Sequence, residues 1–109
     1  MKYLPLTVSS LPAQAMALYP VILFKNDTLK KDKVIIRHEL IHFKQQIELL
    51  VLPFYLLYLV FYLINLLVYR DHHLAYLNIC FEREAYSNDA NPGYLISRRH
   101  YAWIKYIRS

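Results

Sequence analysis

The sequence predicts a mainly α-helical domain, a compact bundle of three to four helices preceded by a short extended or β segment. The 109 residues include a single glycine and 11 tyrosines, which argues against a turn-rich β fold and for packed helices carrying polar-tipped aromatic side chains. Long apolar stretches with helical spacing occupy the middle of the chain. A chain of this length forms one modest core, so we expect residues 1–109 to be one domain.

Charge and cysteine content narrow the class of protein. The net charge is +5, but the basic clusters at residues 30–33 and 98–100 are not accompanied by a nucleic-acid-binding motif, so we expect no nucleic-acid partner. The single cysteine, Cys80, excludes an intramolecular disulfide and fits a reducing compartment. Pro5 interrupts the apolar run that a signal peptide requires. Together these features favour a cytoplasmic location.

The N-terminal part is expected to contain no long regular element, because prolines interrupt residues 1–20 at three places. Residues 11–18 are compatible with one short helix. Residues 21–25 are apolar and rich in β-forming side chains, and Asn26 and Asp27 follow them, which predicts a short strand. Two roles stay open for this strand: it either pairs with an extended peptide substrate or packs over the helices.

The main helix is predicted over residues 32–52, with Thr28 or Asp32 as its N-cap and Pro53 ending it. Residues 49–69 then form an uncharged stretch long enough to span a bilayer. Polar-tipped side chains recur along it at helical spacing, which favours a helix packed in a bundle or lying against lipid over one that spans it. Those side chains are Tyr55, Tyr58, Tyr62, Asn65 and Tyr69.

Two further helices are expected after the apolar stretch. Asp71 can cap a third helix that continues to about residue 88 and carries Glu82 and Glu84 among apolar neighbours. The last helix begins at Asn91 and Pro92, since asparagine is a good N-cap and proline is tolerated in the first turn.

The main helix carries the sequence His-Glu-Leu-Ile-His at residues 38–42. Histidines four residues apart lie on the same face of a helix, so both imidazoles can bind one cation. Catalytic zinc sites use three protein ligands and leave the fourth position open. Glu39 directly follows the first histidine and is placed to act as the general base toward a zinc-activated water. We therefore predict His38 and His42 as zinc ligands and Glu39 as a catalytic residue. Gln45 lies on the same face and either orients a ligand or contacts substrate, or is an ordinary solvent-exposed glutamine.

This motif and the later sequence Phe-Glu-Arg-Glu-Ala-Tyr at residues 81–86 together resemble a minimal gluzincin, a zinc metallopeptidase with an HExxH helix and a glutamate ligand on a later helix. Short bacterial proteins with HExxHxxQQ and FEREAY motifs are similar as well. Aligning Ala85 with the small residue of the family's Glu-x-x-Ala/Ser-Asp pattern implies Glu82 as the third ligand, with Glu84 as the alternative. Tyr86 replaces the family's aspartate, and its hydroxyl is expected to orient a ligand histidine instead.

If Glu82 is to bind the same metal ion as His38 and His42, the chain must turn between them. A continuous helix from 32 to 69 would hold Glu82 about 15–25 Å from the two histidines. We therefore predict a true turn near Pro53.

The resemblance implies a single minimal zincin-like domain that hydrolyses short or extended peptide substrates with Zn²⁺ as cofactor. Three side chains remain candidates for the donor that stabilises the oxyanion: Tyr86, Tyr94 and His100. The alternative function is a membrane-associated helical protein in which the apolar helix at 49–69 contacts lipid or a second copy of the chain. In that case the metal site would be structural or non-catalytic.

Overall fold

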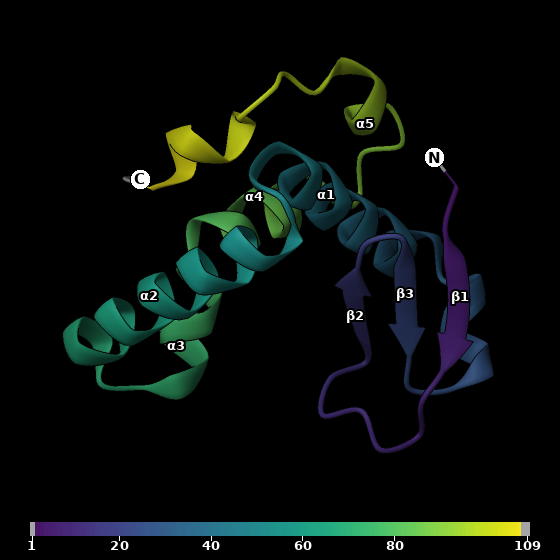
Figure 1. Ribbon diagram of the computed structural model, residues 1–109, viewed down its shortest axis with the longest axis horizontal. Helices are drawn as coiled ribbons and strands as arrows, with labels where there is room; N and C mark the ends of the chain where they lie inside the picture. The colour runs from purple at the N-terminus through teal and green to yellow at the C-terminus, as the bar shows by residue number, and fades with distance from the viewer. Residues whose placement is uncertain (1, 108–109) are drawn as a thin grey trace.

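The computed structural model describes residues 2–107 and is mainly α-helical, as predicted, with a small sheet formed by the N-terminal part of the chain (Figure 1). Its α-helices are α1 (Lys33–Leu49), α2 (Val51–Tyr69), α3 (His72–Leu77), α4 (Cys80–Asn88) and α5 (Tyr94–Ser97). Its strands are β1 (Leu4–Thr7), β2 (Ala15–Leu18) and β3 (Val21–Phe24), and two 3₁₀ helices, η1 (Asp27–Lys31) and η2 (Ala102–Tyr106), complete the described chain. The bundle of three to four helices is thus replaced by five helices and a sheet.

The sheet has the strand order β1-β3-β2, with β1 parallel and β2 antiparallel to the central β3. The predicted strand at 21–25 is confirmed, but the short helix expected at 11–18 is wrong, because residues 15–18 pair with β3 instead. Ile22 and Phe24 alternate toward the core, where they pack with Phe43 of α1. This contact fixes α1 against one face of the sheet. Since β3 is paired on both sides, β1 and β2 are the two edge strands.

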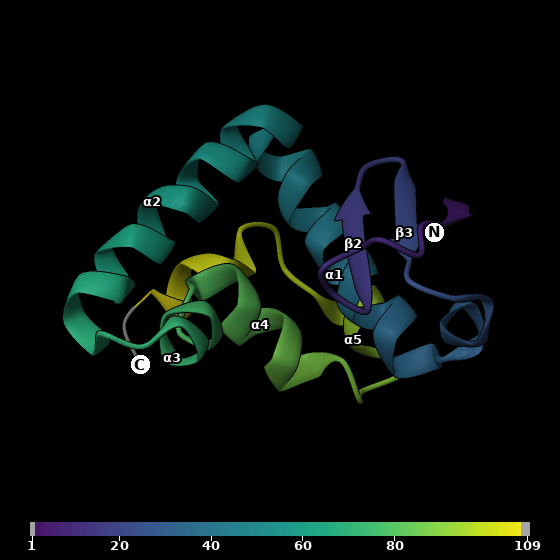
Figure 2. The same cartoon turned by 90° about the horizontal axis from the view of Figure 1, so that it is seen from below.

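The predicted turn near Pro53 is confirmed, and it lies at Leu50, between α1 and α2. Leu50 has a φ of 67°, a positive value that no residue within a right-handed helix adopts, so it ends one helix and redirects the chain into the next. Pro53 falls within the first turn of α2, where the missing N–H breaks no helical hydrogen bond. The two helices therefore diverge from Leu50, and α4 lies in the space between them (Figure 2).

The predicted third helix is divided into α3 and α4 by a break at Asn78 and Ile79. Asp71 caps α3 as expected, since its side chain accepts a hydrogen bond from the Leu74 amide at 2.9 Å. Side chains from α2, α4 and η2 form a second core, which consists of Phe54, Ile79, Cys80, Phe81 and Trp103. This core holds α4 at a fixed level against α2, and so fixes the position of Glu82.

Candidate metal centre

Helix α1 presents His38 and His42 on one face, and α4 brings Glu82 to them. The two Nε2 atoms are 3.2 Å apart, and the Oε1 atom of Glu82 is 3.0 Å from Nε2 of His38 and 3.1 Å from Nε2 of His42. All three side chains are buried. The predicted trio therefore forms a nearly equilateral triangle of potential metal-ligand atoms, and among residues 2–107 it is the group of His, Cys, Asp and Glu side chains with this geometry.

The local fold explains why the imidazoles face α4. Asp32 caps α1 by accepting hydrogen bonds from the amides of Val34 and Ile35, which fixes where the helix begins. Leu40 and Phe43 occupy the opposite side of the helix and pack into the core beneath the sheet. Since the side-chain direction turns by about 100° per residue, this leaves positions 38 and 42 on the side away from the sheet.

The Nδ1 atom of each imidazole has its own hydrogen-bond acceptor. Nδ1 of His38 lies 3.2 Å from a carboxylate oxygen of Asp89, and Nδ1 of His42 lies 2.7 Å from Oε1 of Gln45. The Gln45 amide nitrogen donates to the Phe81 carbonyl and to Glu84, so its oxygen is the atom that faces His42. Both imidazoles therefore carry hydrogen on Nδ1 and direct Nε2 inward, so that loss of any proton on Nε2 gives the tautomer that metal binding requires.

Glu84, the alternative ligand, faces away from the imidazoles. Its carboxylate accepts hydrogen bonds from Gln45, from the Tyr94 hydroxyl at 2.6 Å and from the Arg98 guanidinium at 2.5 and 3.1 Å. Arg98 also donates to both oxygens of Glu48, at 2.8 and 3.0 Å. The three charged side chains are almost fully buried. This cluster ties the C-terminal segment to α1 and α4, directly behind Gln45.

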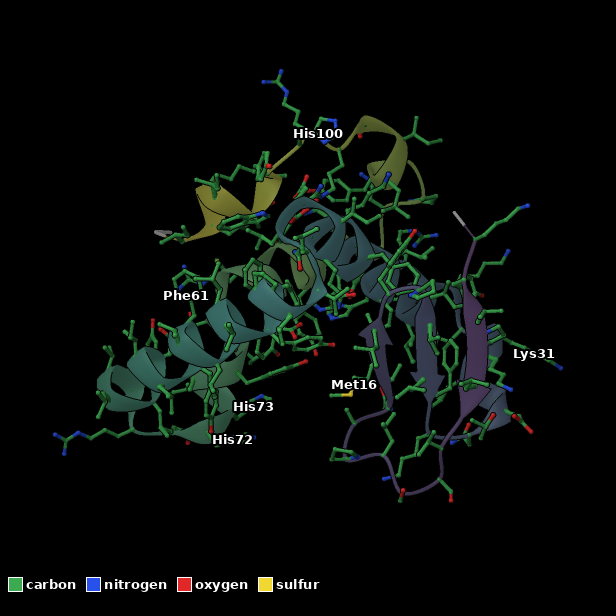
Figure 3. All side chains as sticks on the ribbon, in the orientation of Figure 1. Met16, Lys31, Phe61, His72, His73 and His100 are labelled. Carbon is green, nitrogen blue, oxygen red and sulfur yellow. The ribbon has the colours of Figure 1, made fainter. Side chains whose placement is uncertain are left out.

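The aromatic and histidine candidates for catalysis are placed differently from one another. Tyr86 packs its ring edge-on against His38, with the ring centres 4.4 Å apart, but its hydroxyl pairs with the Tyr76 hydroxyl and not with a ligand histidine. The orienting role expected of Tyr86 is filled by Asp89, one turn further along the chain. Tyr94 is engaged by Glu84, and His100 is almost fully exposed on the C-terminal segment (Figure 3). Neither of these two residues lies at the metal centre.

Two residues at the site had not been singled out from the sequence for it. Asp89 lies seven positions after Glu82, outside the spacing of the family pattern, and only the chain direction after α4 brings it back to His38. Tyr58 donates its hydroxyl to Oε2 of Glu82 at 2.5 Å, which leaves Oε1 directed at the imidazoles. The sequence signalled Tyr58 only as a member of the polar stripe on the apolar helix.

The metal centre lies at the base of a cavity of about 540 Å³ between β2, α1, α2 and α3. Glu39 lines this cavity beside the two histidines, and burial raises the pKa of its carboxyl above the ordinary value. The cavity walls are mostly apolar and aromatic, and Met16 extends from β2 toward α2 at its side (Figure 3). Tyr58 and Tyr76 supply hydroxyl groups to the lining.

In the metal-free protein, the charged forms of His42 and Glu82 stabilise one another. Burial alone favours the neutral forms of both His42 and Glu82, but their mutual attraction and hydrogen bonding prevail. The pKa of His42 is raised to about 9, and the pKa of Glu82 is held below its usual range. A proton therefore occupies the centre when no cation does, and metal binding must displace it.

Comparisons with known proteins give no further assignment. No family model matches the chain, and neither a curated protein nor a solved structure matches it. The geometry of the centre and the chemistry of its side chains are therefore what a functional proposal must rest on.

Proposed function

We propose that this protein is a zinc-dependent peptidase of the gluzincin type, in which His38, His42 and Glu82 hold the metal. The observation that carries the proposal is the inward convergence of two Nε2 atoms and one carboxylate oxygen, separated by 3.0–3.2 Å. Ligand atoms about 2.1 Å from a tetrahedral zinc ion lie about 3.4 Å apart, so a small expansion admits the ion. Two imidazoles and one carboxylate are also a donor set of catalytic zinc sites.

Bound zinc would supply Lewis acidity, which makes water a better nucleophile at neutral pH and polarises a substrate carbonyl. Glu39 is then the general base: its carboxylate accepts the proton of the attacking water, and its raised pKa brings it closer to the working pH. Asp89 and Gln45 hold the two imidazoles in the tautomer that points Nε2 inward. Tyr58 restrains the carboxylate of Glu82.

Strand β2 offers a backbone edge for an extended peptide, because it is an outer strand of the sheet and, unlike β1, its residues line the cavity. Gln46 and Tyr55 both donate to the carbonyl of Ala17, which closes the edge at that residue. Alternate residues of a strand direct their backbone groups to the same side, so Ala15 is the next position whose amide and carbonyl point away from β3. Peptide pairing is thus expected at Ala15, beside Glu39.

The test measures metal content and peptide hydrolysis on the same preparations. We expect the purified protein to bind one zinc ion per chain and to cleave peptides from a quenched-fluorescence library, with activity lost on chelation and restored by zinc. Glu39→Gln should keep the metal and lose about 10²–10⁴-fold in hydrolysis, whereas Glu82→Gln should lose the metal. Asp27→Asn, an exposed acid in η1, is the matched control and should change neither.

Three results would count against the proposal. A protein that takes up no zinc after incubation with the ion contradicts the metal assignment. Zinc uptake without hydrolysis of any library peptide contradicts the peptidase assignment and favours a site that serves folding alone. Full hydrolysis by Glu39→Gln contradicts the assignment of Glu39 as the general base.

A further inference from the structure

Helix α2 has its polar side chains on the inside. Tyr58 donates to Glu82, Tyr62 is hydrogen-bonded to His72, and Asn65 donates to the Ala75 carbonyl at 3.1 Å. Tyr55 likewise donates to the Ala17 carbonyl. A water-facing helix normally shows the reverse arrangement, with apolar side chains toward the protein. Four of the five polar side chains of α2 are therefore hydrogen-bonded within the protein, whereas Tyr69 at the end of the helix is 39% exposed. The side chains on the outer face of the helix are the ones that need a further explanation.

The outer face of α2 consists of aliphatic side chains alone. At 100° per residue, positions 52, 56, 59, 63 and 67 fall on one stripe, and positions 60, 64 and 68 lie beside it. All of these side chains are between 49% and 79% exposed: Leu52, Leu56, Leu59, Val60, Leu63, Ile64, Leu67 and Val68. With 19 residues, α2 extends this surface over about 28 Å. An exposed apolar surface of this extent marks a site of interaction.

The apolar character of the helix and the net charge of the chain favour lipid as the occupant. Residues 51–69 contain no charged residue, and α2 is long and apolar enough to match a bilayer. The chain carries a net charge of +5, which attracts it to anionic lipid headgroups while the aliphatic side chains enter the acyl region. Exposed Arg70 and Asp71 follow the helix and offset one another's charge, so the attraction comes from the chain as a whole. A second copy of the chain is the other occupant that an apolar face can take, and vesicle flotation distinguishes the two.

The packing of α2 decides how the helix would lie. It is long and apolar enough to cross a bilayer, yet α3 and α4 pack along its inner face, and α4 carries buried Glu82 and Glu84. A crossing orientation would draw these polar segments into hydrocarbon at high cost. We propose that this protein binds an anionic lipid bilayer through the outer face of α2, with the helix lying in the plane of the membrane surface.

Membrane binding through this face places the cavity beside the membrane. Leu59 belongs both to the outer face of α2 and to the cavity wall, and Met16, which is 40% exposed, lines the cavity from β2. The substrates of the peptidase would then be chain segments lying at the membrane surface, a consequence that rests on the proposed function. Membrane binding itself depends only on α2 and is tested without any measurement of hydrolysis.

The experiment is flotation of the full chain with phosphatidylcholine vesicles made with and without phosphatidylserine. We expect the protein to float with the anionic vesicles, and the double variant Leu63→Glu/Leu67→Glu to lose at least about 100-fold in partitioning. Ile96→Glu on α5 is the matched control, because Ile96 is 92% exposed but lies away from α2, and it should bind as the unmodified chain does. Circular dichroism and zinc content, measured on the same samples, should be equal for all three proteins.

Three outcomes would contradict membrane binding through α2. One is an unmodified chain that stays with neither kind of vesicle, and another is a double variant that floats as well as the control. The third is a lipid-free dimer, seen by analytical ultracentrifugation, that the double variant converts into a monomer, since this would assign the face to a second copy. None of these outcomes depends on the zinc measurements, so failure of the membrane-binding proposal is distinguishable from failure of the proposed metal site.

Discussion

Arg98 offers the sharpest test of the packing behind the metal centre. Its guanidinium makes paired hydrogen bonds to each of two carboxylates, those of Glu48 and Glu84, at distances of 2.5–3.1 Å. The side chain of Arg98 is 2% exposed, and those of its partners are 5% and 0% exposed. Arg98→Met keeps most of the buried aliphatic volume but leaves two negative groups facing one another without their cation.

The size of the effect follows from this burial. Removing one partner of a buried ion pair typically costs about 3–5 kcal/mol, because the remaining charge has neither solvent nor counter-ion. A domain of this size is stable by about 5–15 kcal/mol, so Arg98→Met should remove a large part of the free energy of unfolding.

Urea unfolding measures this directly, since Trp103 is the single tryptophan and packs against Phe81 in the second core. Arg99→Met changes the neighbouring exposed arginine and should shift the free energy of unfolding by no more than about 0.5 kcal/mol. If Arg98→Met proved as mild as Arg99→Met, the buried cluster would not be the stabilising contact described above.

Three further predictions concern the metal centre itself. Asp89→Ala should weaken zinc binding by about 10–100-fold in a chelator competition while leaving one site per chain, because His38 loses the acceptor that orients it; unchanged affinity would remove Asp89 from the site. Tyr58→Phe should also weaken zinc binding, by less than Glu82→Gln does, and an effect equal to that of Glu82→Gln would contradict a supporting role. The metal-free protein should lose stability as the pH rises from 6.5 through about 9, since the pKa of His42 is raised on folding, and also as the pH falls below 4.5, since that of Glu82 is lowered. Thermal unfolding in the presence of a chelator checks this, and stability that is flat over the alkaline range would refute it.

Helix periodicity, capping residues and helix lengths were sufficient to predict much of the fold from the sequence. The spacing of His38 and His42 fixes their common face on a helix, and Asp32 and Asp71 cap the helices that they were expected to cap. The need for Glu82 to reach the histidines predicted a turn near Pro53, and the chain does turn at Leu50. In each case the deciding interaction lies within a few residues of sequence or follows from the length of a helix.

Contacts between distant segments were not predictable in the same way. Residues 15–18 form a strand because β3 is available to pair with them, although they read as a short helix on their own. Asp89 reaches His38 across 51 positions, and Arg98 reaches Glu48 across 50. No periodicity or motif connects such residues, so the partners that orient and support the metal centre emerge only in three dimensions.

The most direct measurement of the central claim is the position of zinc in a crystal of the metal-loaded protein, located by anomalous scattering at the zinc absorption edge. We expect one zinc ion per chain, about 2.0–2.2 Å from Nε2 of His38, Nε2 of His42 and a carboxylate oxygen of Glu82, with Glu39 outside the set of ligands. A crystal grown with zinc that shows no ion between these three side chains, or an ion held by Glu84 instead of Glu82, would contradict it.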